Sequence, residues 1–123
     1  VELPSITAEG YTPIHALLQS QDRPTAMVVS DDILALTLER ICMELGLSIP
    51  KDLSILSFNN SLFARLTSPQ LTSIDINSCQ LGIEAAAQMI SHIEQPQLPA
   101  TKILVPHRLI ERDSCAEISE NPV

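Results

Sequence analysis

One continuous stretch, residues 25–58, constrains the fold more than any other part of the chain. Thr25–Ser30 is a short apolar run with β-branched residues, and Leu53–Phe58 is a second such run. Both follow charged and proline-containing segments, which is typical of buried parallel strands. Since the residues between them have helical spacing, the stretch reads as a right-handed strand–helix–strand crossover whose strands point the same way. We therefore predict an α/β fold around a parallel sheet.

The helix between these strands is marked at both ends. Asp31 and Asp32 suit an N-cap and a first turn, because carboxylates accept the free backbone N–H groups and face the positive end of the helix dipole. Gly46 stands where a left-handed C-terminal cap is needed. Between the caps runs one apolar stripe at helical spacing, made of Leu34, Leu38, Ile41 and Leu45. This helix is predicted to cover one face of the sheet.

The remaining sequence extends this unit into a three-layer α/β fold, with a parallel sheet and flanking helices. Expected in addition are helices over Tyr11–Ser20 and Ser78–Ile93, a loop or short turn over 62–68, and strands at Thr72–Ile76 and within Lys102–Arg112. Pro106 confines the last strand to a sheet edge or a crossing between lobes. The polar tail from Asp113 onward is expected to be disordered.

Composition and charge exclude several classes of protein. Seven Lys and Arg against fifteen Asp and Glu give a net charge of −8, so we do not expect this segment to bind DNA by itself. No stretch approaches the ~18 apolar residues of a membrane span, and the start does not resemble a signal peptide. Cys42, Cys79 and Cys115 are odd in number and widely spaced, which favours free thiols in a reducing cytoplasm. Because Val1 is not an initiator Met, we expect an excised piece of a longer protein.

No catalytic constellation is visible in the sequence. His15, His92 and His107 are far apart and lack metal-ligand spacing, which favours surface or structural roles. There is no nucleophile elbow, no Cys set beside a His, and no glycine loop suited to a phosphate. We therefore expect no enzymatic activity, no metal and no cofactor.

Short polar side chains follow the predicted strands where each of them ends. They are Asp31, Asp32, Asn59, Asn60 and Asp75. Parallel strands bring such residues to one edge of the sheet, where open α/β folds bind ligands. Carboxylates and amides are equipped to hydrogen-bond the vicinal hydroxyls of a sugar. The same residue types are also ordinary caps and turns, and the pattern alone favours that structural role.

A second apolar surface lies outside the predicted core. Leu36 and Met43 fall on the side of the first long helix opposite to its main stripe, with Ile33 on the flank. Leu62, Phe63 and Leu66 add apolar residues to what should be an exposed loop. This pattern favours a partner interface over scattered surface hydrophobes. The helix over 78–93 is apolar over more than half its circumference and is also expected to be buried against a large surface.

Several short segments together resemble the effector-binding core of the LacI/GalR repressors, from Gly10 to about Cys115. Residues 58–77 look most like those of maltose-operon repressors. The matching segments are Pro24–Ala26, Ser30–Asp32, Leu34–Leu36, Leu45–Leu47, Ile49–Pro50, Asp52–Ser54, Ser57–Asn60, Pro69–Ile74, Leu81–Gly82 and Val105–Arg112.

The resemblance implies a periplasmic-binding-protein-like fold of two lobes with a sugar between them, assembled as a dimer with an N-terminal DNA-binding domain. Residues 1–75 would belong to the C-terminal lobe without its first strand, and 76–100 would be the crossover and a helix of the N-terminal lobe. Residues 101–115 would return as a strand, and 116–123 would form a flexible tail. The chain would then be one incomplete lobe.

The resemblance also implies roles for single residues. Asp31 and Asn59, with Asn60 beside them, would bind the effector, and Asp32 would cap the helix. Asn59 stands where the family has Asp, and Ser57 where it has Gly. An amide cannot hydrogen-bond two adjacent sugar hydroxyls in the way a carboxylate does, so the identity of the effector is left open. The dimer contacts would fall on Ile33, Leu36, Met43, Phe63 and Leu66.

The sequence thus predicts the sugar-sensing and dimerising part of a cytoplasmic transcriptional regulator. This regulator would bind operator DNA only through an N-terminal domain that lies outside the given sequence. An extracytoplasmic sugar-binding protein of a transporter is the alternative, and it would be a monomer. A small α/β enzyme acting on phosphorylated sugars is a third reading, which lacks its nucleophile or phosphate loop here.

Overall fold

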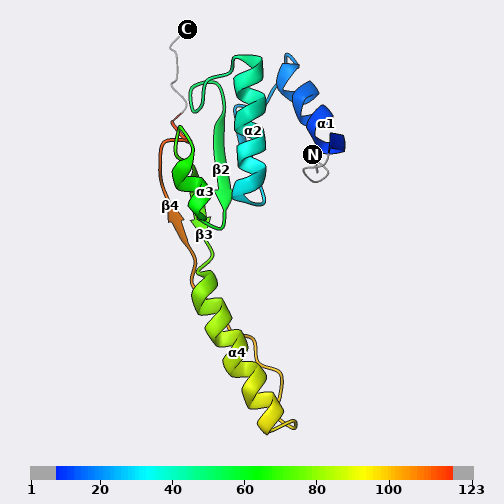
Figure 1. Cartoon of the computed structure of the whole chain (residues 1–123), viewed down its shortest axis with the longest axis vertical. Helices are drawn as coiled ribbons and strands as arrows, with labels where there is room; N and C mark the ends of the chain where they lie inside the picture. Colours follow the sequence, from blue (N-terminus) through cyan, green and yellow to red (C-terminus); the bar gives the residue numbers. More distant parts are fainter. Residues whose placement is uncertain (1–7, 118–123) are drawn as a thin grey trace.

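The computed structural model describes residues 8–117 and contains an α/β unit with a helical arm (Figure 1). Every helix and strand that the sequence predicts is present, although the strands are shorter than expected. In chain order the elements are α1 (Ala8–Gln19), β1 (Ala26–Val28), α2 (Asp32–Leu45), β2 (Ser54–Phe58), α3 (Leu62–Leu66), β3 (Thr72–Asp75), α4 (Ser78–Glu94) and β4 (Arg108–Ile110).

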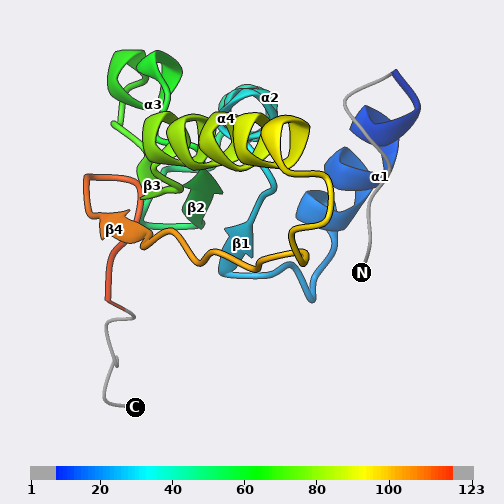
Figure 2. The same ribbon diagram turned by 90° about the horizontal axis from the view of Figure 1, so that it is seen from below.

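The four strands form one sheet in the order β1-β2-β3-β4. The pairs β1–β2 and β2–β3 are parallel, with Ala26 opposite Ser54 and Leu56 opposite Thr72, so the predicted parallel pairing of the first two strands is confirmed. The pair β3–β4 is antiparallel, because α4 carries the chain away and residues 95–107 bring it back (Figures 1 and 2). The sheet is therefore mixed, with β4 at an edge as Pro106 indicates.

The core lies between the sheet, α1 and α2. Leu38 and Ile41 of the predicted α2 stripe are fully buried, and both ends of the helix are capped. Gly46 has a φ of 69° and its N–H reaches the carbonyls of Cys42 and Met43, which is the left-handed cap that the sequence predicts. Completing the core are Ile14, Leu18, Val29, Ala35, Cys42, Leu53, Ile55, Ala64 and Leu71.

The prediction of a buried strand at residues 25–30 is wrong for β1. This strand is at the edge of the sheet, and Val28 is 67% exposed while Met27 packs on the core. A fully buried strand needs a cover on both faces. Among residues 8–117, only one face of β1 has such a cover.

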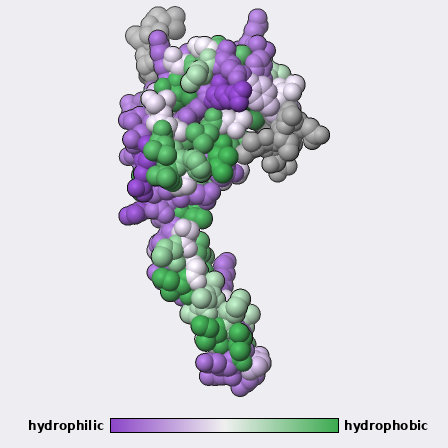
Figure 3. Space-filling view, viewed as in Figure 1, coloured by the Kyte–Doolittle hydropathy of each residue, from purple (hydrophilic) through white to green (hydrophobic). Residues whose placement is uncertain are grey.

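The arm formed by α4 and residues 95–107 extends away from the α/β unit (Figure 1). None of the residues of α4 is buried, and its apolar side chains are open to solvent, with Ile93 72% exposed. Figure 3 shows hydrophobic residues along its visible face. The broad apolar surface that the sequence predicts is thus present, and the described residues do not cover it.

The segment after β4 is ordered where the sequence predicts disorder. Ser114 is fully buried, its hydroxyl donates to the carbonyl of Ile55 at 2.6 Å, and it accepts the N–H of Thr72 at 2.8 Å. The carbonyl of Ser114 also accepts the N–H of Ile55 at 2.8 Å. Buried backbone groups of β2 and β3 need such partners, so the prediction of disorder is wrong for residues 113–114. Residues 118–123 of the predicted tail lie outside the described residues.

Two further expectations concern single features. Cys42, Cys79 and Cys115 are free thiols, as predicted. No helix within the described part of the chain has the length and hydropathy needed to cross a bilayer.

Candidate functional site

The candidate site is the edge of the sheet where β1, β2 and β3 end. Asp31 and Asp32 follow β1, Asn59 and Asn60 follow β2, and Asp75 is the last residue of β3. Because these strands are parallel, their carboxyl ends meet at one edge. The structure therefore brings together the polar residues that the sequence singles out.

Asp31 is the N-cap of α2. One of its carboxylate oxygens accepts the backbone N–H of Leu34 at 2.8 Å, and the other accepts the hydroxyl of Ser30 at 3.2 Å. The residue is only partly buried. A carboxylate accepts about two hydrogen bonds per oxygen, so Asp31 keeps acceptor capacity for a ligand while it caps the helix.

Asp32 has a different role from the cap that the family resemblance implies. Its side chain is 2% exposed and binds three donors, the hydroxyls of Ser57 at 2.6 Å and Ser73 at 2.9 Å and the N–H of Ser61 at 2.6 Å. The prediction is wrong because the N-cap is Asp31, one residue earlier, which leaves Asp32 in the first turn pointing inward. Asp32 thus fastens α2 to β2, to β3 and to the loop after β2.

The ionisation of Asp32 follows from the same contacts. Burial opposes the charged form, but the hydrogen bonds from Ser57, Ser61 and Ser73 outweigh it and hold the pKa below its ordinary value. The carboxylate is charged at neutral pH, accepts hydrogen bonds from three protein donors and is almost completely shielded from solvent. It therefore forms the base of the site and is not a free ligand group.

Asn59 and Asn60 both have positive φ, 94° and 47°. Asn tolerates this conformation better than most residues. The backbone N–H of Asn59 donates to the carbonyl of Ile74 at 2.9 Å, and its exposed side chain has no hydrogen-bond partner among residues 8–117. Asn59 therefore presents a free amide at the rim.

The Asn60 side chain is already engaged within the protein. Its oxygen accepts from the guanidinium of Arg112 at 2.5 Å, and its nitrogen donates to Asp75 at 3.3 Å. Its backbone N–H donates to the Ser73 hydroxyl at 3.0 Å. Asn60, like Asp31, thus has part of its side-chain hydrogen-bonding capacity used by the protein, whereas the amide of Asn59 is free.

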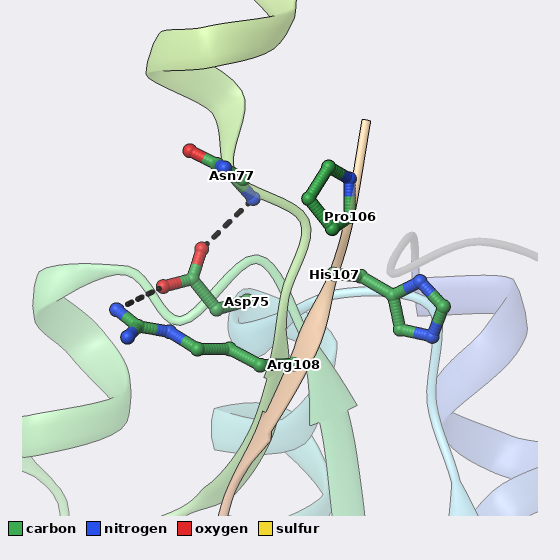
Figure 4. A pocket seen from close by; sticks show the side chains of 5 residues that line it. All are labelled: Asp75, Asn77, Pro106, His107 and Arg108. Atoms are coloured by element: carbon green, nitrogen blue, oxygen red, sulfur yellow. Dashed lines mark hydrogen bonds and ion pairs between the residues drawn. The ribbon is translucent and has the colours of Figure 1, made fainter. Parts of the chain in front are cut away.

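A hollow of about 420 Å³ lies beside the rim, where the chain leaves β3 for α4 and returns to β4 (Figure 4). Asp75 contributes a carboxylate that accepts the N–H of Asn77 at 2.9 Å and pairs with Arg108 at 3.4 Å. The Asn77 N–H, together with Asn60 and Arg108, overcomes desolvation and lowers the pKa of Asp75. Pro106 and His107 complete the lining.

Sequence reasoning missed the partners of these rim residues. Ser73, Arg108 and Arg112 lie in segments that match the family, but the sequence assigns them no role, since their contacts depend on the register of β3 against β2 and β4. That antiparallel register joins residues about 35 positions apart, such as Asp75 and Arg108. Only Ser57 gave a signal, as the residue that departs from the family's glycine.

The α2–α3 apolar surface consists of Ile33, Leu36, Met43, Leu62, Phe63 and Leu66. Met43 is 79% exposed and Leu66 70% exposed, whereas Leu36 is partly buried. Figure 3 shows hydrophobic residues gathered over α3 and the neighbouring start of α2. The second apolar surface predicted from the sequence is therefore exposed in this chain, apart from Leu36. Within residues 8–117 no group of three or more His, Cys, Asp or Glu side chains is placed to hold a metal ion.

Comparison with known proteins places the chain in a family. Residues 4–115 match the family model described as "periplasmic binding protein-like domain". Among curated proteins, the HTH-type transcriptional repressor PurR of Pectobacterium carotovorum is 36% identical over 108 residues, which is 88% of this chain and 32% of the repressor. The chain thus spans about one third of the length of the curated relatives it matches.

Two solved structures support the same placement. A putative LacI transcriptional regulator from Bacillus cereus has a TM-score of 0.82 and 36% identity, covering 88% of this chain and 38% of that one. A LacI family transcriptional regulator from Enterococcus faecalis with bound ribose has a TM-score of 0.85 and 30% identity, covering 97% and 44%. The chain belongs to the periplasmic binding protein-like domain family, in the form found in LacI-family transcriptional regulators.

Proposed function

We propose that this chain senses a small-molecule effector for a LacI-family transcriptional regulator, and that the effector is a sugar. The observation that carries the proposal is the rim at the ends of β1 and β2. There the spare acceptors of Asp31 and the free amide of Asn59 stand above the hydrogen-bonded base formed by Asp32. Such groups bind hydroxyls well, and the similar Enterococcus faecalis regulator holds ribose.

In this proposal Asp31 and Asn59 contact the sugar directly. Asp31 accepts hydroxyl protons, whereas the amide of Asn59 donates one hydrogen bond and accepts another. Asn60 lies beside them in the rim, with part of its capacity already used by Arg112 and Asp75. The effector would favour one orientation of two lobes, and the change in operator affinity cannot exceed the difference in effector affinity between those orientations.

The helix of the arm is proposed to belong to the second of the two lobes. We assign residues 76–100 to a second lobe, because α4 is apolar on most sides and buries none of its residues against the described chain. Residues 1–75 and 101–115 form the first lobe. The sugar would bind between the two lobes, and the domain that contacts operator DNA would lie elsewhere in a longer cytoplasmic protein.

The α2–α3 apolar surface is proposed to bind a second copy of the same regulator. Its members come from two elements that contact each other, and most of them are exposed. Exposed apolar patches of this kind are typical of subunit interfaces. Ile33, Leu36, Met43, Phe63 and Leu66 would form the centre of that interface.

The identity of the sugar stays a prediction. Maltose follows only from the sequence resemblance over residues 58–77, and none of the three relatives described above bears on it. Titration of the intact regulator with maltose and with D-ribose, followed by calorimetry, tests the class. Binding of neither sugar at millimolar concentration would contradict the proposal that the effector is a sugar of this kind.

Two matched substitutions test the residues. Asp31→Ser keeps a side-chain oxygen for the N-cap while it removes the carboxylate, and Asn59→Gly removes the amide while it tolerates the positive φ. Each is expected to weaken sugar binding about tenfold or more, the effect of losing a hydrogen bond to a buried ligand. Operator affinity without sugar should stay unchanged. If both variants bind sugar with unchanged affinity, Asp31 and Asn59 have a purely structural role.

The alternative of an extracytoplasmic sugar-binding protein is not favoured, because the similar proteins reported above are described as transcriptional repressors or regulators. Sedimentation of the intact protein distinguishes the two readings. A dimer agrees with the regulator, whereas a monodisperse monomer at high concentration would favour the transport protein.

A further inference from the structure

Asn60 joins three parts of the chain that are far apart in sequence. Its amide oxygen accepts from Arg112, its amide nitrogen donates to Asp75, and its backbone N–H donates to Ser73. Asp75 ends β3, where the chain leaves for the arm, and Arg112 follows β4, where the chain has come back. The segment that leaves for the arm and the segment that returns from it therefore both hydrogen-bond to Asn60.

These partners are themselves held in place. Arg112 donates to the carbonyl of Leu71 at 2.6 Å, and its backbone N–H donates to the Thr72 hydroxyl at 3.0 Å. Asp75 also pairs with Arg108 across the two crossing segments (Figure 4). A shift of β4 along β3 would therefore change the distance from Arg112 to Asn60 and the pairing of Arg108 with Asp75.

The conformation of Asn59 depends on this neighbour. Both residues have positive φ, which costs energy for residues other than Gly and persists only where the surroundings enforce it. The side chain of Asn59 makes no bond that could enforce it within residues 8–117. The loop is held by the N–H of Asn59 on the Ile74 carbonyl, by the N–H of Ser61 on Asp32, and by the three hydrogen bonds of Asn60. Those of the Asn60 side chain tie the loop to Asp75 and Arg112.

We propose that Asn60 is a positioning residue, which sets the orientation of Asn59 according to how the two crossing segments lie. This inference rests on the proposed function, in which Asn59 contacts the effector. Asn60 itself then touches Arg112 and Asp75 and not the sugar. A change in lobe orientation, transmitted through β3 and β4, would alter the rim, and effector binding would act on the crossing in return.

A measurement without effector tests the positioning directly. Asn60→Gly removes the amide but accepts the positive φ, and Asn59→Gly is the matched control that introduces the same backbone freedom one residue away. Amide hydrogen exchange is followed at position 59 and at Ser61, in each variant of the intact regulator. We expect about tenfold faster exchange in Asn60→Gly than in Asn59→Gly, the effect of about one lost hydrogen bond on local opening.

Equal exchange in the two glycine variants would overturn the proposal. Asn60→Asp provides a second test, because it keeps an acceptor for Arg112 but cannot donate to Asp75 while ionised. Its exchange is expected to fall between that of the unmodified protein and that of Asn60→Gly. Exchange equal to that of the unmodified protein would show that the Asp75 bond contributes nothing.

A double-mutant cycle with D-ribose as the probe separates positioning from direct contact. Arg112→Lys keeps the charge but cannot donate to Asn60 and Leu71 in the same fork geometry. If Asn60 acts through Arg112, Asn60→Gly lowers affinity about tenfold in the unmodified background and much less in the Arg112→Lys background. Equal losses in both backgrounds would mean that Asn60 contacts the sugar itself. If neither D-ribose nor maltose binds, the proposed sugar site fails, whereas the exchange result still decides the positioning role.

Discussion

The α/β unit and the arm differ in how far the apolar residues of their helices are buried. In α2 the main apolar stripe is covered within the unit, with Leu38 and Ile41 buried against the sheet and α1, while Ile33 and Met43 outside this stripe are open to solvent. In α4 they spread around most of the helix, and no residue is buried. The main stripe of α2 is covered by the sheet and by α1, whereas a helix that is apolar on most sides needs cover from another body. This difference supports the proposed boundary between two lobes.

The largest difference between the two regions is expected in the free energy of unfolding after substitutions in the core and on the arm. Leu38→Ala removes buried methyl groups and leaves a cavity, so the free energy of unfolding should fall by about 2–5 kcal/mol. Ile90→Ala on the arm, where the side chain is 57% exposed, is the matched control. It should change the free energy of unfolding of this chain by less than about 0.5 kcal/mol. Urea unfolding of both variants gives the two values, and equal losses would mean that the arm is packed in solution.

The next largest effect is expected at the base of the site. Asp32→Asn replaces one acceptor oxygen by an NH₂ group that faces the donors of Ser57, Ser61 or Ser73. The free energy of unfolding should fall by about 1.5–3 kcal/mol, the typical contribution of hydrogen bonds to a charged group. Asp22→Asn, at an exposed position, is the control. Equal stability of the two variants in urea would show that the Asp32 contacts are not retained in solution.

A smaller effect of Asp32 should appear on acidification. Its pKa is lowered in the folded state, so the carboxylate stabilises the fold above its ordinary pKa of about 4, and this contribution is lost as the pH falls further. The urea midpoint of the unmodified chain should therefore decrease from about pH 5 to pH 3, and that of Asp32→Asn should decrease less. Parallel pH profiles would mean that other carboxylates account for the whole acid sensitivity.

The smallest effect on stability is expected on the α2–α3 apolar surface. Leu66 is 70% exposed, so Leu66→Glu should change the free energy of unfolding by no more than about 0.5 kcal/mol. In the intact regulator the same change should prevent dimerisation, because a carboxylate would be buried without a partner. Sedimentation equilibrium measures the second effect. A variant that remains dimeric would show that this surface is not the interface, and would leave the arm as the apolar surface still without cover.

Much of the α/β unit follows from local sequence patterns. The caps at Asp31 and Gly46 and the α2 stripe predict the helix with nearly correct ends, and the two flanking apolar runs predict parallel pairing. These features depend on residues close in sequence, where helical and strand periodicities are strong. The ordered segment at Ser114 could not be predicted, because it is stabilised by backbone groups of β2 and β3 that are more than 40 residues away.

The candidate site shows the same division. The sequence correctly gathers Asp31, Asp32 and the Asn pair at one edge, but the family resemblance assigns the cap to Asp32, and the hydrogen bonds of Asp32 with Ser57 and Ser73 are not predicted. A shift of one residue in the N-cap decides which carboxylate points outward, and periodicity does not resolve single positions at a helix end.

The amino-acid sequence by itself determined the α/β class, the direction of the first strands, the family resemblance and the presence of two apolar surfaces, since all of these depend on short-range order in the chain. Only the tertiary structure decided which polar groups remain free. Whether a carboxylate or amide is available to a ligand depends on donors brought by other strands, as Arg112 and Asp75 reach Asn60. A hydrogen bond depends on distance and angle between atoms, and these follow from strand register and not from residue type.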